Sequence, residues 1–234
     1  MKKSIFKILA ASLIIGVSAC SSDESSDQPV LSVSFKTVNS FDTQAQASNI
    51  MEKSSHSSFV FNDGFITLTS MAYEAETQND STSIEFELEG VVVIDFATGI
   101  PTPDIRPIAI PAGTYQEVEV EIELLDESDS PSVVLNGIYT ARDETVHPVR
   151  FEFNSGETFE VEREGTITFT QSQSTIAEIT FDPSVWFIGV TAELMANATK
   201  DVNGVIVISE TQNSNIFDIV ADGLDIATEL EITN

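Results

Sequence analysis

Apolar and acidic residues alternate within one segment near the middle of the chain, Thr114–Leu125 (TYQEVEVEIELL). In an extended strand, successive side chains point to opposite faces, so the apolar residues share one face and the glutamates share the other. The apolar set is Val118, Val120, Ile122 and Leu124, and the acidic set is Glu117, Glu119, Glu121 and Glu123. The pattern predicts a β-strand with one face on a hydrophobic core and the other in water.

Further segments of this kind predict that strands make up most of the chain. The continuous apolar run Val91–Ile94 predicts a strand that is buried on both faces. Turn clusters such as Pro111-Ala112-Gly113 separate the strands, which is typical of a sandwich or a barrel. We expect a mainly β fold, an antiparallel β-sandwich with one or two short helices near the C-terminus. The other predicted strands are 31–36, 64–72, 83–96, 133–141, 149–153, 158–163, 166–170 and 176–181.

Helical patterns lie near the C-terminus. The segment Thr191–Ala198 predicts a short helix with Thr191 as its N-cap. The segment Ser214–Ala221 predicts a second helix, because apolar residues recur there at helical spacing after a capping Ser or Asn. The segment Glu229–Ile232 predicts a last edge strand.

The N-terminus has the layout of a secretion signal, with three lysines, a short apolar run and small residues. The residues Val17-Ser18-Ala19-Cys20 resemble the lipobox of bacterial lipoproteins, in which the cysteine is acylated and cleavage falls just before it. The resemblance implies that residues 1–19 are removed and that Cys20 carries the lipid anchor. Acyl chains contribute about 0.8 kcal/mol per buried methylene, so several chains on Cys20 would hold the protein in a membrane. Cys20 is the only cysteine of the chain, so no intrachain disulfide is available.

The residues after Cys20 predict a tether. Residues 20–29 contain no apolar side chain after the cysteine except Pro29, so they cannot form a core. A Ser/Asp/Glu run in this place also resembles the surface-export signal of Bacteroidota-type lipoproteins, which implies outer-membrane, surface-exposed localisation. Residues 30–234 are long enough for a single domain with one substantial core.

The charge balance excludes one class of partner. The chain has 38 acidic and 10 basic residues, a formal net charge of −28. Such a polyanion repels nucleic acid, so we expect no DNA or RNA partner.

One segment matches part of a calcium-loop pattern. Asp201, Asn203 and Glu210 stand at loop positions three, five and twelve, with Gly204 at position six. However, Thr199 occupies the first position, where an aspartate is expected. The alternative is an ordinary Asn-Gly turn that leads into a strand. Ca²⁺ is therefore the only cofactor that the sequence suggests.

Two further groups are candidates for a site. Trp186 and Phe187 follow an Asp-Pro turn and form either a ligand-stacking platform or a plug at the end of a sandwich. His56 and His147 are the only histidines, and each is expected to be an exposed loop residue. No Gly-x-Ser-x-Gly motif is present, and no catalytic residue is predicted.

Several short motifs resemble a group of Bacteroidota-type lipoproteins with β-sandwich domains and no assigned activity. They are Glu89–Asp95, Ile110–Tyr115, Leu135–Gly137, and Phe181–Pro183 with Trp186-Phe187. The resemblance implies a fold and a location. We expect a surface-anchored, non-enzymatic module that is attached to the membrane through its lipid and binds or presents a glycan or an envelope protein. The alternatives are a calcium-dependent adhesion or ligand-capture module and, with least support, a hydrolase that uses a carboxylate pair or His147.

Overall fold

The computed structural model describes residues 28–43, 57–77, 83–126, 130–154, 158–224 and 228–233. The predicted signal, the predicted anchor Cys20, most of the predicted tether and His56 lie outside these ranges. The described residues form a mainly β fold with few short helices, which confirms the predicted fold class.

The elements follow one another in the order strands, two short helices, a strand, a longer helix and a last strand. Their bounds are β1 (Val30–Thr37), β2 (Ser40–Asp42), β3 (Ser58–Glu76), β4 (Ser83–Asp95), β5 (Pro101–Thr102), β6 (Ile108–Ala109), β7 (Gly113–Leu124), β8 (Val133–Thr140), β9 (Val146–Phe153), β10 (Thr158–Phe169), β11 (Ser174–Phe181), α1 (Pro183–Trp186), α2 (Ala192–Ala196), β12 (Ile206–Ile208), α3 (Ser214–Leu224) and β13 (Thr228–Thr233).

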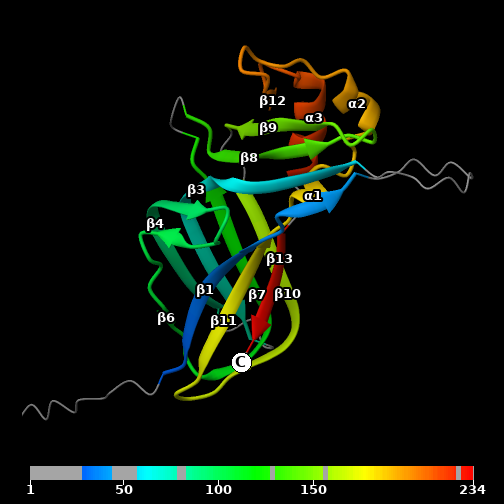
Figure 1. The fold of residues 1–234 in the computed structure, drawn as a ribbon. Coiled ribbons are helices and arrows are strands. Elements are labelled where there is room, and N and C mark those ends of the chain that lie inside the picture. Colours follow the sequence, from blue (N-terminus) through cyan, green and yellow to red (C-terminus); the bar gives the residue numbers. More distant parts are fainter. Residues whose placement is uncertain are drawn as a thin grey trace, which may run out of the picture.

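The long strand β3 organises a nine-stranded sheet. Its first half pairs with β8 and its second half with β7, both antiparallel. The change of partner occurs at Thr67, whose N–H donates to Ser132 O at 2.7 Å and whose carbonyl accepts from Leu125 N at 3.0 Å. Strand β9 continues the sheet beyond β8, and β10 continues it beyond β7. The sheet therefore has an upper part, with β8, β9 and β12, and a lower part, with β4, β7 and β10 (Figure 1).

A second, four-stranded sheet covers the lower part. Its strand order is β13-β11-β1-β6, and Figure 1 shows β1, β11 and β13 in front of β7 and β10. Phe35 and Ile179 of this sheet and Val120 and Ile122 of β7 are buried in one continuous core. Two layers of this kind are compatible with the predicted β-sandwich.

Two strand pairs depart from the antiparallel prediction. Strand β1 pairs with β11 in parallel, from Val30 opposite Ser174 to Thr37 opposite Phe181, and β9 pairs with β12 in parallel. Parallel neighbours need a long connection, so the partner lies far away in the sequence. A local hydrophobic pattern predicts a strand but carries no information on such a partner.

The helices cover the upper part of the large sheet (Figure 1). Helix α3 places Phe217 against β9, with ring centroids 6.0 Å from Phe153 and 6.3 Å from Phe151. Helix α2 begins after Thr191, whose Oγ1 accepts from Leu194 N at 3.3 Å, which confirms the predicted N-cap. Strand β13 lies at the edge of the small sheet, as predicted for Glu229–Ile232.

The apolar residues of β7 are buried, and the outward residues of neighbouring strands are acidic. Val118 and Ile122 are completely buried, which confirms the predicted strand face. The prediction for Val91–Ile94 is wrong, because Val91 is 52% exposed and Val93 is 38% exposed. These two side chains lie on the outer face of β4, which no layer of the described fold covers fully.

Glu74 provides a test of the acidic outer face. In the register, Glu74 of β3 lies directly between Glu85 of β4 and Glu119 of β7. Like charges directly opposite each other destabilise a sheet, by an amount within the roughly 0.2–1 kcal/mol of cross-strand pairs. We expect Glu74→Gln to raise the free energy of unfolding by about 0.5–1 kcal/mol at low salt, measured by urea denaturation. The gain should shrink as added salt screens the charges.

The charge-matched control is Glu210→Gln, which removes an exposed carboxylate outside this row. An equal gain in the control would show that the overall net charge, and not the row of glutamates, sets the effect. A loss of stability in Glu74→Gln at low salt would contradict the prediction.

Candidate functional site

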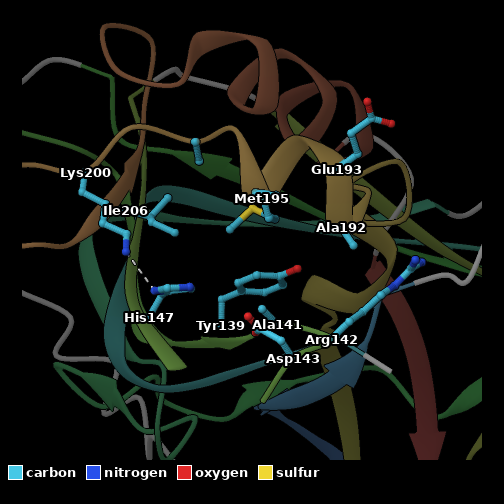
Figure 2. Close-up of a pocket in the computed structure, with 12 residues that line it drawn as sticks. Tyr139, Ala141, Arg142, Asp143, His147, Ala192, Glu193, Met195, Lys200 and Ile206 are labelled. Atoms are coloured by element: carbon cyan, nitrogen blue, oxygen red, sulfur yellow. Dashed lines mark hydrogen bonds between the residues drawn. The ribbon is translucent and has the colours of Figure 1, made fainter. Parts of the chain in front are cut away.

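A pocket of about 520 Å³ lies between α2 and the end of the β8–β9 hairpin (Figure 2). Pockets for small molecules typically have volumes of about 300–1,000 Å³. Strands β8, β9 and β12, the β8–β9 turn, α2 and the segment after α2 contribute side chains to it.

The inner surface of the pocket is apolar. Tyr139 of β8, Met195 of α2 and Ile206 of β12 line it, and each is at most 2% exposed. Three alanines of α2 and the segment that follows it, Ala192, Ala196 and Ala198, add small side chains. The small alanines leave space beside the larger buried groups, so the sheet and the helix enclose a hollow.

A lysine and a histidine meet at one side of the pocket. Lys200 Nζ donates to His147 Nδ1 at 2.9 Å, although 53 residues separate them in sequence. The ring of His147 lies nearly parallel to the ring of Tyr139, with an interplanar angle of 17° and centroids 6.4 Å apart. Tyr139 and His147 are cross-strand partners on β8 and β9, so the sheet register fixes their relative position.

Acidic groups at the pocket edge are oriented by local contacts. The Asp143 carboxylate accepts from Thr145 N at 3.0 Å in the β8–β9 turn. Hydrogen bonds from the side chain and backbone of Thr145, with a smaller contribution from His147, hold the pKa of Asp143 below its usual value. Figure 2 shows the carboxylate of Glu193 directed away from the centre of the pocket, and Arg142 on the side opposite His147.

The prediction for His147 as an exposed loop residue is wrong. His147 is part of β9, is half-buried and lines the pocket. The alternation of β9 places it on the same face as the buried Val149 and Phe151. That face continues under α2, which the local sequence around His147 does not reveal.

The ligand-platform prediction for Trp186 and Phe187 is also wrong. Both residues are 2% exposed, so neither ring offers a face to a ligand. Trp186 ends α1 and packs edge-on against Phe181, with centroids 6.5 Å apart. The alternative interpretation, a plug that closes the apolar core, describes these rings correctly.

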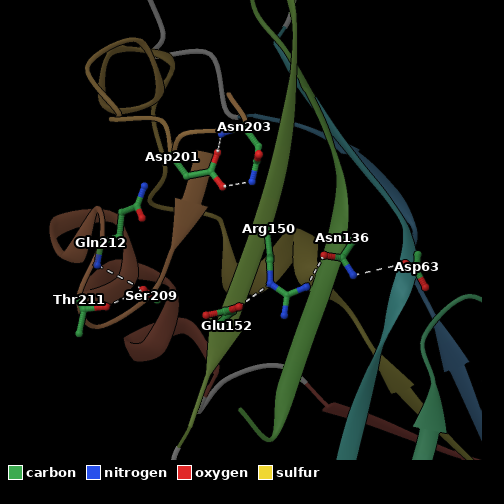
Figure 3. A network of polar contacts seen from close by, with 9 residues as sticks. All are labelled: Asp63, Asn136, Arg150, Glu152, Asp201, Asn203, Ser209, Thr211 and Gln212. Atoms are coloured by element: carbon green, nitrogen blue, oxygen red, sulfur yellow. Dashed lines mark hydrogen bonds and ion pairs between the residues drawn. The ribbon is translucent and has the colours of Figure 1, made fainter. Parts of the chain in front are cut away.

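The predicted calcium loop has a different local structure. The Asp201 carboxylate accepts from Asn203 N at 2.9 Å and from Val205 N at 2.8 Å, so it closes its own turn. Strand β12 follows and separates this turn from Glu210, by about 10 Å for three residues at roughly 3.3 Å each. Figure 3 shows Asp201 at one end of β12 and Ser209 at the other. Among the described residues, no group of three or more His, Cys, Asp or Glu side chains is placed to hold a metal. Calcium binding through Asp201, Asn203 and Glu210 stays a prediction.

Asp201 makes the stability of the fold depend on pH, and the direction of its pKa shift sets the sign of that dependence. Hydrogen bonds from the backbone, of Val205 first, hold the pKa of Asp201 below its ordinary value of 3.8. Because the folded-state pKa is the lower one, the ionised Asp201 carboxylate stabilises the fold in full at pH values above its unfolded-state pKa. This stabilisation is lost as the pH falls through the folded-state pKa. We expect Asp201→Asn to lower the melting temperature at pH 7 and to reduce the further loss between pH ~5 and ~2.

The comparison variant is Asp104→Asn, which removes an exposed aspartate between β5 and β6. Its melting temperature should follow that of the unmodified protein across the acid range. Parallel melting curves for Asp201→Asn and the unmodified protein would show that the turn does not depend on the ionised carboxylate.

A polar ladder crosses the outer face of the upper sheet. Arg150 Nη1 donates to Asn136 Oδ1 at 3.0 Å, and Asn136 Nδ2 donates to Asp63 Oδ2 at 3.3 Å (Figure 3). Arg150 also forms an ion pair with Glu152. These contacts join β3, β8 and β9 on the face opposite the pocket, so they hold together the strands that carry Tyr139 and His147.

Comparison of the chain with protein-family models, with curated proteins and with solved structures finds no match. Among the described residues, no helix is long and apolar enough to cross a membrane. The resemblance to Bacteroidota-type lipoproteins stays a prediction.

Proposed function

We propose that the chain is a lipid-anchored, non-enzymatic protein of the outer-membrane surface that binds a small ligand in the pocket between α2 and the β8–β9 hairpin. The pocket itself is the observation that carries the proposal. It combines a suitable volume with the accessible methyl groups of Ala192, Ala196 and Ala198 and a few polar groups at one side, which resembles the usual composition of a small-molecule site.

The position of the pocket suits an anchored protein. The described chain enters β1 at the lower end of the molecule, whereas α2 and the β8–β9 turn lie at the upper end (Figure 1). A lipid on Cys20 would therefore attach the protein at the end opposite the pocket. The predicted tether would leave the pocket open to the surroundings.

The side chains around the pocket favour binding over hydrolysis. The residues found to line it include no serine, threonine or cysteine in the described part of the chain, so a side-chain nucleophile of those types is not at hand. His147 Nδ1 accepts a hydrogen bond from Lys200. In a catalytic triad, by contrast, this nitrogen donates to a carboxylate that orients the ring.

The burial of Trp186 and Phe187 removes the residues that suggested a glycan-stacking surface. The pocket takes their place as the candidate binding site. An envelope protein as a partner stays a prediction.

A pocket-filling variant tests the proposal. We expect a library of small molecules with apolar bodies to contain ligands that bind the lipidated protein in phosphatidylcholine nanodiscs, measured by calorimetry against empty nanodiscs. Ala196→Trp places an indole at the pocket from an exposed helix position and should abolish binding. Ala97→Trp, at an exposed turn far from the pocket, is the matched control and should bind normally.

Two results would contradict the proposal. One is a library that yields no ligand. The other is a set of ligands whose affinity is the same in Ala196→Trp and in the unmodified protein.

A further inference from the structure

Strand β4 has a free edge in the described fold. On one side it pairs with β3 from Ser83 to Asp95, whereas on the other side β5 reaches only Val93 and Ile94. Between residues 83 and 92, the backbone N–H and C=O groups that point away from β3 therefore face no strand that the structure describes. Such a row of unpaired groups is a template for the addition of a further strand.

The opposite edge of the lower sheet is covered, in contrast to β4. Strand β10 ends the sheet there and lies against β13 of the small sheet, and Figure 1 shows β10 and β4 on opposite sides of the lower part. In β4, every residue from 85 to 91 is exposed except the half-buried Leu88. A Cβ atom placed on Gly90 would meet no atom of the described fold beyond its chain neighbours within 4 Å. The edge of β4 is therefore accessible to a partner.

The exposed part of β4 presents a different kind of side chain on each face. The outward side chains are those of Glu85, Glu87 and Glu89. Phe86 and Leu88 point to the core face, because they lie opposite the buried Tyr73 and Met71 of β3. Phe86 is nevertheless 37% exposed, since it stands at the edge of the sheet. A strand added beside β4 would cover this ring with its own core-facing side chains.

The three glutamates determine which kind of strand fits. The ion pairs found among the described residues join Lys36 to Glu178 and Arg150 to Glu152, so neither neutralises β4. Opposite charges on neighbouring strands stabilise a sheet, and like charges destabilise it. A second copy of β4 would place glutamates beside glutamates, on a chain with a net charge of −28. A strand with cationic side chains on its outer face and apolar ones on its core face is complementary.

We propose that the free edge of β4 binds an extended cationic segment of another protein, which joins the large sheet as a further strand. Backbone hydrogen bonds along residues 83–92 hold the segment. Alternating cationic and apolar side chains provide the selectivity, because they pair with the glutamates on one face and cover Phe86 on the other. The residues that line the pocket include none from β4, so this site is separate from the proposed ligand site.

A matched series of peptides tests the proposal. Calorimetry with the lipidated protein in phosphatidylcholine nanodiscs, against empty nanodiscs, compares the acetylated and amidated peptides KVKVKVK, KKVVVKK and EVEVEVE. The second peptide has the composition of the first but cannot place its lysines on one face and its valines on the other. We expect KVKVKVK to bind at least about tenfold more tightly than the other two, because several cross-strand pairs act together. Added salt should weaken this binding.

Variants of the protein locate the contact. Glu87→Lys should weaken the binding of KVKVKVK several-fold and strengthen that of EVEVEVE. Glu210→Lys changes the net charge equally at an exposed position outside β4, and it should leave both affinities nearly unchanged. Phe86→Ala keeps the charges but removes the ring that the valines would cover, so it should also weaken the binding of KVKVKVK.

Hydrogen–deuterium exchange identifies the backbone that the peptide contacts. Saturating KVKVKVK should slow exchange in residues 83–92, because an added strand accepts from the N–H groups at the free edge. Exchange in the exposed turn of residues 201–204 should not change.

Five results would overturn the proposal. They are no binding of KVKVKVK, equal affinity for KKVVVKK, an equal loss in Glu210→Lys, and unchanged exchange in residues 83–92 with bound peptide. The fifth is slower exchange in these residues as the protein concentration rises without peptide, which would show that a second copy occupies the edge. None of these results involves the pocket, so the proposed ligand-binding function is tested separately.

Discussion

Replacement of Phe187 by alanine is expected to lower the free energy of unfolding by about 3–5 kcal/mol. Phe187 follows α1 and is 2% exposed. Its ring is central to an aromatic cluster, in which the centroid distances are 5.0 Å to Phe59, 5.4 Å to Phe61, 5.6 Å to Phe151 and 5.8 Å to Phe41. Alanine would remove these contacts and leave a cavity at the point where β2, β3 and β9 meet the helical layer.

The physical reason for so large an effect is that the cavity cannot close easily. The neighbouring rings belong to hydrogen-bonded strands, and close-packed interiors relax only partially around a deletion. Phe187→Leu keeps most of the volume and should lose less than half as much stability. Urea denaturation followed by tryptophan fluorescence measures both variants, because Trp186, the only tryptophan, is the preceding residue.

Phe86→Ala is the control for loss of a phenyl ring, since Phe86 is 37% exposed on β4. It should cost well under half of the Phe187→Ala effect. A loss below about 1 kcal/mol in Phe187→Ala would show that the cluster does not hold the helical layer on the sheet.

Local patterns were sufficient to predict much of the fold. The alternation in Thr114–Leu125 predicted β7 and its buried face, and Thr191 was recognised as an N-cap. Both features depend only on residues that are close together in the sequence. The parallel pairing of β1 with β11 was not predicted, because nothing near Val30 specifies a partner that begins at Ser174.

Local sequence patterns could not predict the pocket, for the same reason. Lys200 and His147 are 53 residues apart, and each looks like an ordinary polar residue beside a turn. The sequence around Asp201 predicted a calcium loop. In the structure these residues form a turn, and the pocket residue is Lys200, directly before it. Lys200 and Arg142 were not predicted as site residues. The scarcity of positive charge is the one sequence signal that could have drawn attention to them, and only the structure places them around one pocket.

Replacement of Asn213 is the second change that is expected to lower the free energy of unfolding strongly. The same side chain holds the segment that carries Lys200 at the pocket. Its Oδ1 accepts from Thr199 N at 2.8 Å, and its Nδ2 donates to Thr199 O at 3.0 Å and to Val207 O. The backbone of Asn213 has φ of 53°, a left-handed conformation that asparagine tolerates better than alanine. Asn213→Ala should therefore lower the free energy of unfolding by about 3 kcal/mol, from lost hydrogen bonds and backbone strain.

The two causes can be separated. Asn213→Gly loses the same hydrogen bonds without the strain of a side chain at positive φ, and it should be about 1 kcal/mol more stable than Asn213→Ala. Urea denaturation measures the difference. Equal stability of the two variants would show that the positive φ is not maintained in solution.

Asn213 also fixes Thr199, the residue before Lys200, to the strand β12 and to the start of α3. The carbonyl of Asn213 accepts from Ile216 N at 2.9 Å and Phe217 N at 3.1 Å, so the helix begins on this residue. Loss of the side chain should release the segment that carries Lys200, which lines the pocket, and weaken the binding of pocket ligands in Asn213→Ala and Asn213→Gly alike. Unchanged affinity for a pocket ligand from the small-molecule library, in a folded Asn213→Gly protein, would show that the shape of the pocket does not depend on this anchor. The glycine variant is the decisive one because it loses the contacts without the backbone strain.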